Sequence, residues 1–201
     1  MALTTYTELR AAMGTVAIRS DMATYSADCI ALCEAQLNRE LRVRRMIARA
    51  TASIDAEYSA VPLDFVAPRT FVVDDTALVY VTPDKADEFS LVTSLADGVS
   101  YYTIVGTEFR YLPAPTSAVT GKLTYWQRIP DLATNSTNWL LTTSPDVYLY
   151  GALIQFAAIV QDERAGVWTN LYLSALAALK SADQVENLGA VLLPQLNMVT
   201  P

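Results

Sequence analysis

The sequence has no histidine, only two cysteines and only seven glycines among its 201 residues. Without histidine a Ser-His-Asp triad is excluded, and a structural zinc site lacks its usual nitrogen ligands. The chain also has no Gly-rich phosphate loop and no G-x-S-x-G motif. These absences argue against an enzyme of the common hydrolase, phosphoryl-transfer or zinc-dependent classes, and we expect neither a cofactor nor a metal.

The two cysteines, Cys29 and Cys33, are four residues apart in a helical pattern. On one face of a helix their β-carbons lie roughly 5–6 Å apart, farther than a disulfide prefers. Because free cysteine is among the most buried residue types, we expect two buried, reduced thiols.

Positive charge is scarce, with 14 Lys and Arg against 21 Asp and Glu and a formal net charge of -7. A free nucleic-acid-binding protein needs a surplus of cations on at least one face, so sequence-specific DNA binding is not expected. No basic stretch followed by an apolar run opens the chain, so we expect no cleaved secretion signal and folding in a cytosol.

No apolar run is long enough to cross a bilayer. Residues 147–160 read VYLYGALIQFAAIV, with one Gln and no charge, but fourteen residues fall short of the roughly 20 that a membrane helix needs. A surface helix shows a polar face, and this segment has none, so it should be enclosed on all sides by a core or by a subunit interface. The excess of apolar surface over residues 144–189 favours burial against other protein chains.

Helical periodicity covers both ends of the chain, and a two-residue repeat covers the middle. Residues 4–45 predict two helices that break near Ser20 and Asp21, a pair suited to an N-cap. From Ala48 apolar and polar residues alternate, which is typical of a half-buried strand. Further strands are predicted at residues 71–73, 78–81, 101–105, 108–112 and 122–127.

Turn and cap residues set the boundaries between these elements. Asp74-Asp75 predicts a turn, and Gly106-Thr107 a hairpin with a type II′ turn. Thr82-Pro83-Asp84 and Ser144-Pro145-Asp146 each predict a helix start. Between them lies a predicted loop at residues 129–138, and the last helix, residues 162–188, is amphipathic with Gly189 as C-cap.

These elements predict an α+β fold in a single domain. Helices from residues 1–46 and 139–189 form one lobe, a β-rich insertion covers residues 47–138, and residues 190–201 form a C-terminal tail. On the last helix the sequence predicts an apolar face composed of Trp168, Leu171, Tyr172, Ala175 and Leu179, opposite a polar face of Asn170, Ser174, Ser181 and Gln184.

Five of the 14 basic residues fall in one short stretch: Arg39, Arg42, Arg44, Arg45 and Arg49. Residues 51–108 hold ten acids against Arg69 and Lys85. One interpretation is a basic belt that meets the acidic β lobe of a neighbouring subunit or an acidic partner ring. An equally weighted interpretation is a helix C-terminus carrying cations that complement its dipole, with Glu40 and Arg44 paired four residues apart. A nucleic-acid channel is a third, weaker alternative.

Two other groups of residues invite a functional interpretation. Paired acids at Asp74-Asp75 and Asp162-Glu163 could serve glycosidase chemistry, but a turn and the first turn of a helix explain them better. An aromatic set could stack on sugars or single-stranded nucleic acid, but sheet packing is favoured because strands are rich in aromatics. That set is Tyr101, Tyr102, Phe109, Tyr111, Tyr125, Trp126 and Trp139.

The order of several short segments resembles the head-to-tail adaptor (connector) proteins of tailed bacteriophages. The segments are LNRELRVRR (37–45), VPLDF (61–65), YVTP (80–83), YYTIVG (101–106), RYLPAP (110–115), TNWLL (137–141) and PDVYLYGAL (145–153), followed by the helix of Trp168. Each is weak alone, but together they span nearly all of residues 9–188.

This resemblance implies a structural virion protein with no catalytic residues, made in the bacterial cytoplasm and located at the neck between head and tail. It implies a ring of twelve copies that docks under the portal protein, extends the DNA channel and presents a platform for tail proteins. It also implies that the C-terminal tail reaches into the portal, which makes Leu192, Leu193 and Leu196 candidate interface residues beside the five arginines. The alternatives are a virion-associated cell-wall glycan hydrolase and a generic oligomeric protein-binding module.

Overall fold

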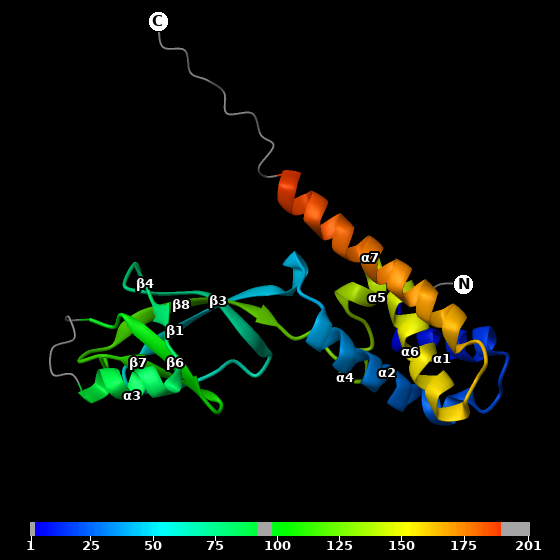
Figure 1. Cartoon of the computed structure of the whole chain (residues 1–201), viewed down its shortest axis with the longest axis horizontal. Helices are drawn as coiled ribbons and strands as arrows, with labels where there is room; N and C mark the ends of the chain where they lie inside the picture. The colour runs from blue at the N-terminus through cyan, green and yellow to red at the C-terminus, as the bar shows by residue number, and fades with distance from the viewer. Residues whose placement is uncertain (1–2, 92–97, 190–201) are drawn as a thin grey trace, which may run out of the picture. The chain divides into compact units, whose positions relative to one another are not determined.

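The computed structural model describes residues 3–91 and 98–189, with side chains as far as residue 186. The predicted α+β class is confirmed. The chain divides into a helical unit, Met1–Arg45 with Ile129–Pro201, and a β unit, Met46–Arg128 (Figure 1). Within the described ranges, no helix combines the length and apolar character that a membrane crossing requires.

The helical unit begins with two helices, α1 (Tyr6–Ala17) and α2 (Met22–Glu40), that break where the sequence predicts. Thr5 and Glu8 form a capping box, which satisfies free N–H groups at the start of α1. Asp21 precedes α2, but its carboxylate bonds Arg19 instead of capping the helix. The expected side-chain N-cap is therefore replaced by an ion pair.

Helix α6 (Pro145–Val160) forms the centre of the helical unit and packs against α1, α2, α5 (Trp139–Thr143) and α7 (Ala165–Gly189). Its buried residues run from Val147 to Ala157. The predicted enclosure is confirmed for most of the helix, and this chain's own helices supply it, but Ala158 and Ile159 near its end are exposed. The expectation that burial of α6 needs other chains is therefore wrong: high apolar content alone does not distinguish a core from an interface.

A close approach of three helices explains the one glycine inside α6. A Cβ at Gly151 would lie 2.5 Å from Cys33 Sγ and 3.1 Å from Tyr172 Cε2. Cys29 and Cys33 are buried and unbonded, as predicted. Burial raises the pKa of Cys29 to about 11, which keeps this thiol protonated and unreactive.

Polar side chains inside the helical unit fix the segment that precedes α6. Glu34 Oε1 accepts from the Leu132 N–H at 2.9 Å and from the Tyr148 hydroxyl at 3.3 Å. Asn138 donates to Tyr148 Oη at 2.7 Å and caps α5 through the Leu141 N–H. The region predicted as a loop, residues 129–138, also contains a one-turn helix, α4 (Leu132–Asn135), and the Leu132 N–H at its start is the one that Glu34 accepts.

The β unit contains two four-stranded sheets in its described part, with orders β1-β8-β3-β4 and β2-β7-β6-β5. Helix α3 (Pro83–Leu91) packs on β6 and β7 and starts at the predicted proline (Figure 1). The strands are β1 (Ile47–Ile54), β2 (Tyr58–Ala60), β3 (Phe65–Val73), β4 (Thr76–Ala77), β5 (Val79–Tyr80), β6 (Tyr101–Val105), β7 (Glu108–Leu112) and β8 (Val119–Gln127).

Both predicted turns are present. Asp74 and Asp75 adopt φ of 45° and 64° between β3 and β4, and Gly106 adopts φ of 63° between β6 and β7. The segment predicted at residues 78–81 does not extend the first hairpin. Within this segment, strand β5 pairs in parallel with β6 in the other sheet. Local periodicity does not reveal with which distant strand a segment pairs.

The aromatic set mainly packs the core of the β unit, as favoured from the sequence. Tyr102, Phe109, Tyr111 and Tyr125 are buried with Phe71 between the sheets. Phe71 makes edge contacts with three of these rings at centroid distances of 5.3–5.7 Å. These rings are therefore unavailable for stacking on a sugar or a nucleic-acid base.

Candidate functional site

The five predicted arginines do not form one helical belt. Helix α2 ends at Glu40, because Leu41 takes an extended conformation with φ -91° and ψ 131°. Arg44 lies in the 3-10 turn Arg44–Met46, and Arg49 lies on β1 in the other unit. The predicted helical pair between Glu40 and Arg44 is wrong, because the chain leaves the helix before Arg44.

Arg42 caps the end of α2. Its Nη1 donates to the Asn38 carbonyl at 2.9 Å and to the Leu41 carbonyl at 2.6 Å. Carbonyls in the last turn of a helix lack intrahelical donors, and a cation there complements the helix dipole. Arg42 therefore fits the interpretation in which the arginines are cations that complement the C-terminal end of a helix dipole.

Arg44 and Arg45 are engaged within the helical unit. The Arg44 N–H donates to Asp183 Oδ1 at 2.8 Å, and its guanidinium pairs with Glu186 near the end of α7. Arg45 Nη1 donates to Thr143 Oγ1 at 2.9 Å. These two arginines join the end of the N-terminal segment to α5 and α7.

Arg39 and Arg49 remain available. Both are exposed, and neither has a hydrogen-bond or ion-pair partner among residues 3–91 and 98–186. The apolar candidates Leu192, Leu193 and Leu196 lie outside the described residues.

The acids of the β unit are partly neutralised by that unit's own cations. Arg110, whose side chain is 14% exposed, pairs with Glu57 at 2.7 Å and Asp87 at 2.6 Å, and these bonds raise its pKa. Lys122 pairs with Asp75 at 3.2 Å. Since Arg49 also belongs to this unit, the charge contrast between the two units is smaller than the linear sequence indicates.

Helix α7 presents an exposed uncharged face. Val167, Leu171 and Val185 are 59%, 41% and 65% exposed. With the exposed residues Ser174, Ala178 and Ala182, they recur at helical spacing along one side of α7; we call these six residues the α7 stripe.

The other side of α7 packs on α6, with Trp168, Tyr172, Ala175 and Leu176 buried. Leu171 was predicted to share a face with Trp168 and Tyr172, but it is exposed, and Leu176 is buried with them instead. The helix also begins at Ala165, three residues after the predicted start. Asp162 instead binds Arg164 in the preceding turn, and this contact lowers the pKa of Asp162 to about 2.

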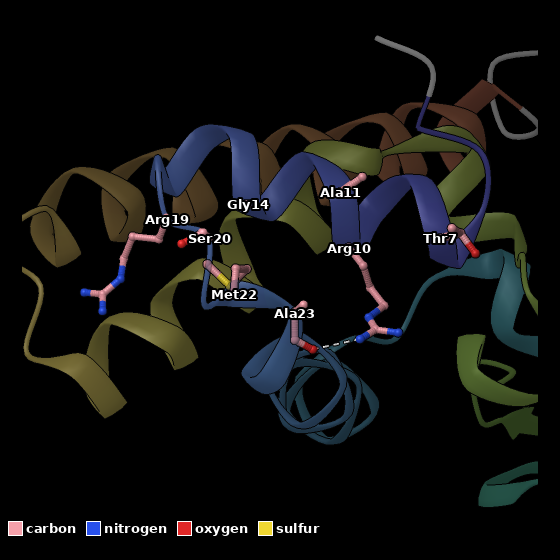
Figure 2. A pocket seen from close by; sticks show the side chains of 8 residues that line it. All are labelled: Thr7, Arg10, Ala11, Gly14, Arg19, Ser20, Met22 and Ala23. Carbon is pink, nitrogen blue, oxygen red and sulfur yellow. Dashed lines mark hydrogen bonds between the residues drawn. The ribbon is translucent and has the colours of Figure 1, made fainter.

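A hollow of about 390 Å³ lies between α1 and α2 (Figure 2). Its two cations already have partners: Arg10 donates to Ala23 O at 2.8 Å and to Ser26 Oγ at 2.7 Å, and Arg19 binds both oxygens of Asp21. No carboxylate lines it. The lining residues are Thr7, Arg10, Ala11, Gly14, Arg19, Ser20, Met22 and Ala23.

The paired acids have structural roles. Asp74 and Asp75 form the β3–β4 turn, and Asp162 orders the turn before α7. Within the described residues, no group of three or more Cys, Asp or Glu side chains could hold a metal ion. The described geometry therefore gives no specific support to the glycan-hydrolase alternative.

Sequence reasoning missed the partners of Arg44 and Arg110. Arg44 and Glu186 are 142 residues apart, and Arg110 joins β7 to α3 and to the segment before β2. No local spacing rule relates such positions. Their only sequence signal is a complementary charge, which many other residues share.

The model of one protein family, described as SU10 adaptor protein, matches residues 4–193. A comparison with curated proteins gives no significant match.

Proposed function

The chain belongs to the SU10 adaptor protein family of phage head-to-tail adaptors, and on this basis we propose that it docks as a ring beneath the portal of a phage head. In this proposal the ring has twelve copies, lengthens the DNA channel without reading DNA sequence, and forms the platform to which the tail attaches. Membership of this family makes the chain a structural protein of the bacteriophage particle.

The observation that best supports a ring is the α7 stripe. The helical unit closes its own core around α6, and yet Val167, Leu171 and Val185 remain exposed on one side of α7. A line of uncharged side chains on a helix suits packing against another protein. A closed ring requires a heterologous contact, in which this face of one copy meets a different face of the next.

The arginines divide between two roles in this proposal. Arg42, Arg44 and Arg45 hold the helical unit together through bonds within it. Arg39 and Arg49, exposed and without partners in the described part, contact acidic groups of a neighbouring copy or of the portal. Leu192, Leu193 and Leu196 contact the portal in the assembled particle.

A pair of matched variants tests the role of the α7 stripe. Leu171→Asp with Val185→Asp places two charges in the stripe, whereas Asn170→Asp with Gln184→Asp adds the same charge to a polar side of α7. We expect the first variant to stay folded but to lose co-sedimentation with tailless, portal-bearing particles. The second should co-sediment like the wild type. Equal binding by both variants would contradict the proposed contact.

A charge-reversal variant tests the arginines. Reversal of Arg44 and Arg45 would disturb contacts inside the helical unit, so it does not report on an interface. Arg39→Glu with Arg49→Glu removes the two exposed cations without breaking a bond in the described part. We expect weaker binding to the same particles at low salt, with a smaller further loss as salt is added, because the attraction that salt screens has been removed; unchanged binding at low salt would remove these residues from the interface.

A further inference from the structure

The outer face of the sheet β1-β8-β3-β4 carries positive charge. Alternate residues of its strands, among them Ala50 and Leu123, pack into the core between the two sheets, so the residues between them point outward. The three long strands contain three cations and no acidic residue: Arg49 on β1, Arg69 on β3 and Lys122 on β8. All three cations are exposed, so each long strand contributes one positive charge to this face.

Two of these cations have no carboxylate partner in the described part of the chain. Lys122 is paired with Asp75 of the β3–β4 turn at 3.2 Å. Arg69 lies over the ring of Trp126, with 4.9 Å between its Cζ and the ring centroid, and Arg49 has no partner. The indole holds the guanidinium of Arg69 above the sheet without neutralising its charge. Arg49 and Arg69 are therefore free to bond carboxylates from outside the β unit.

Helix α3 covers the opposite face of the β unit (Figure 1). Tyr102 is in the core between the sheets, so its neighbour Tyr101 lies on the outer face of the second sheet, where it packs on Phe89 of α3 with 5.0 Å between ring centroids. Arg110 of β7 binds Asp87 of α3 on the same face at 2.6 Å. The β unit therefore has the first sheet on one side and α3 on the other.

The face formed by α3 and the outer side of the second sheet carries negative charge. Within the described residues five carboxylates lie there against two cations, Lys85 and Arg110, which leaves an excess of three negative charges. The carboxylates are those of Glu57, Asp84, Asp87, Glu88 and Glu108. Asp84, Glu88 and Glu108 are exposed, and only Glu88 among these three has an ion-pair partner, the exposed Lys85. These three acids can accept bonds from another chain.

A second copy of this chain is the partner that accounts for both faces. An acidic face and a basic face on opposite sides of one folded unit allow copies to associate front to back, which is the heterologous contact that a closed ring requires. DNA would use the basic face alone, and the net charge of -7 opposes its approach. The charges of the β unit therefore favour contact between copies.

We propose that the outer face of the first sheet in one copy contacts α3 and the start of β7 in the next copy, with Arg49 and Arg69 bonded to Asp84, Glu88 and Glu108. This contact rests on the proposed ring and assigns Arg49 to the neighbouring copy. Guanidinium groups suit it because they bind carboxylates with two parallel bonds. Both faces lie on one folded unit, so the contact forms between free copies without the portal.

Sedimentation of the free full-length protein at low salt tests this contact. We expect the wild type to associate as its concentration rises to about 1 mM, and salt to weaken the association. Arg49→Glu with Arg69→Glu, or Glu88→Lys with Glu108→Lys, should each raise the dissociation constant at least about tenfold, because like charges then face one another. A wild type that does not associate, or twofold variants that associate like it, would overturn the proposal.

A charge exchange identifies the two faces as partners. With all four substitutions in one chain the attraction returns with its sign reversed, so the dissociation constant should return to within about threefold of the wild-type value. An equimolar mixture of the two twofold variants should also associate, although neither does so alone. A mixture and a fourfold variant that both stay defective would overturn the proposal.

A matched control separates pairing of the faces from net charge. Arg49→Glu and Arg69→Glu are combined with Asp28→Lys and Glu163→Lys, two exposed positions of the helical unit. This chain has the same net charge as the fourfold variant but keeps the acidic face, so it should remain defective. Recovery of association in this control would contradict the pairing of the two faces.

Two further measurements distinguish this contact from DNA binding and from the portal. Loss of binding to a short DNA duplex by Arg49→Glu with Arg69→Glu, with self-association unchanged, would overturn the proposal and assign the basic face to phosphates. Self-association that follows the charges without binding to portal-bearing particles would contradict the proposed function alone. Portal binding by chains whose self-association ignores these charges would overturn only the contact between β units.

Discussion

Arg44 and Glu186 form an ion pair that holds the last turns of α7 against the segment that leads into β1. The Arg44 N–H strengthens this link through Asp183. The pair joins residues 142 positions apart, both in the helical unit. It therefore ties the last turns of α7 to the end of the N-terminal segment within the helical unit.

Removal of this pair should loosen the end of α7. Both side chains are about half exposed, so we expect Arg44→Met to cost at most about 1 kcal/mol of global stability. The larger effect should be faster amide exchange in the last two turns of α7. Arg39→Met removes an exposed arginine without a described partner and should leave α7 unchanged. Equal α7 exchange in both variants would mean that the pair does not hold the helix end.

Gly151 should not tolerate a methyl group. Its Cβ would meet Cys33 Sγ at 2.5 Å and Tyr172 Cε2 at 3.1 Å, so Gly151→Ala should lower the free energy of unfolding by about 1–3 kcal/mol. Gly166→Ala is the matched control, because no atom lies within 4 Å of its Cβ. Urea denaturation measures both, and a neutral Gly151→Ala would show that α2, α6 and α7 pack less closely than described.

Ile18 is a branched residue in a left-handed conformation. Its φ is 54° at the end of α1, and its side chain is 84% exposed. Ile18→Gly should therefore raise the free energy of unfolding by about 1 kcal/mol, because glycine adopts this conformation without steric cost. Ile18→Val keeps the branch at Cβ and should give no gain. A loss of stability in the glycine variant would contradict the conformational explanation.

Glu34 should make stability depend on pH. Burial of its carboxyl raises the pKa above the ordinary value of 4.5, although bonds from Leu132 and Tyr148 act in the opposite direction. Because the folded-state pKa is the higher one, the contribution of this group is fully present below pH 4.5 and is lost as pH rises through the folded-state pKa.

Glu34→Gln removes the titration and keeps an oxygen acceptor for the Leu132 N–H. We expect the variant to gain stability relative to the wild type between pH 4.5 and pH 8, measured by urea denaturation at each pH. Glu40→Gln, an exposed site on the same helix, controls for the change in net charge. A wild-type advantage that grows with pH would contradict the assigned direction.

Local rules predicted much of the fold. The break between α1 and α2, the helix starts at Pro83 and Pro145, and the β6–β7 hairpin at Gly106 all follow from caps, prolines and turn residues within a few positions. Buried thiols at Cys29 and Cys33 followed from composition and spacing. The ordered segments also pointed to the adaptor family, which the family match confirms.

The missed features depend on contacts between distant residues. Periodicity predicted a strand at residues 78–81 but not that it would pair with β6 in the second sheet. Hydrophobicity marked α6 as enclosed but could not say that α1, α2 and α7 would enclose it. Periodicity grouped Leu171 with Trp168 and Tyr172 on one face of α7, but Leu171 is exposed while the other two are buried.

The most direct test of the adaptor role is electron microscopy of tailless, portal-bearing phage heads mixed with the full-length protein. We predict a closed ring of twelve copies directly below the portal, with the DNA channel continuing through its centre. Heads that show no added density at the portal after saturation with folded protein would contradict the proposed role.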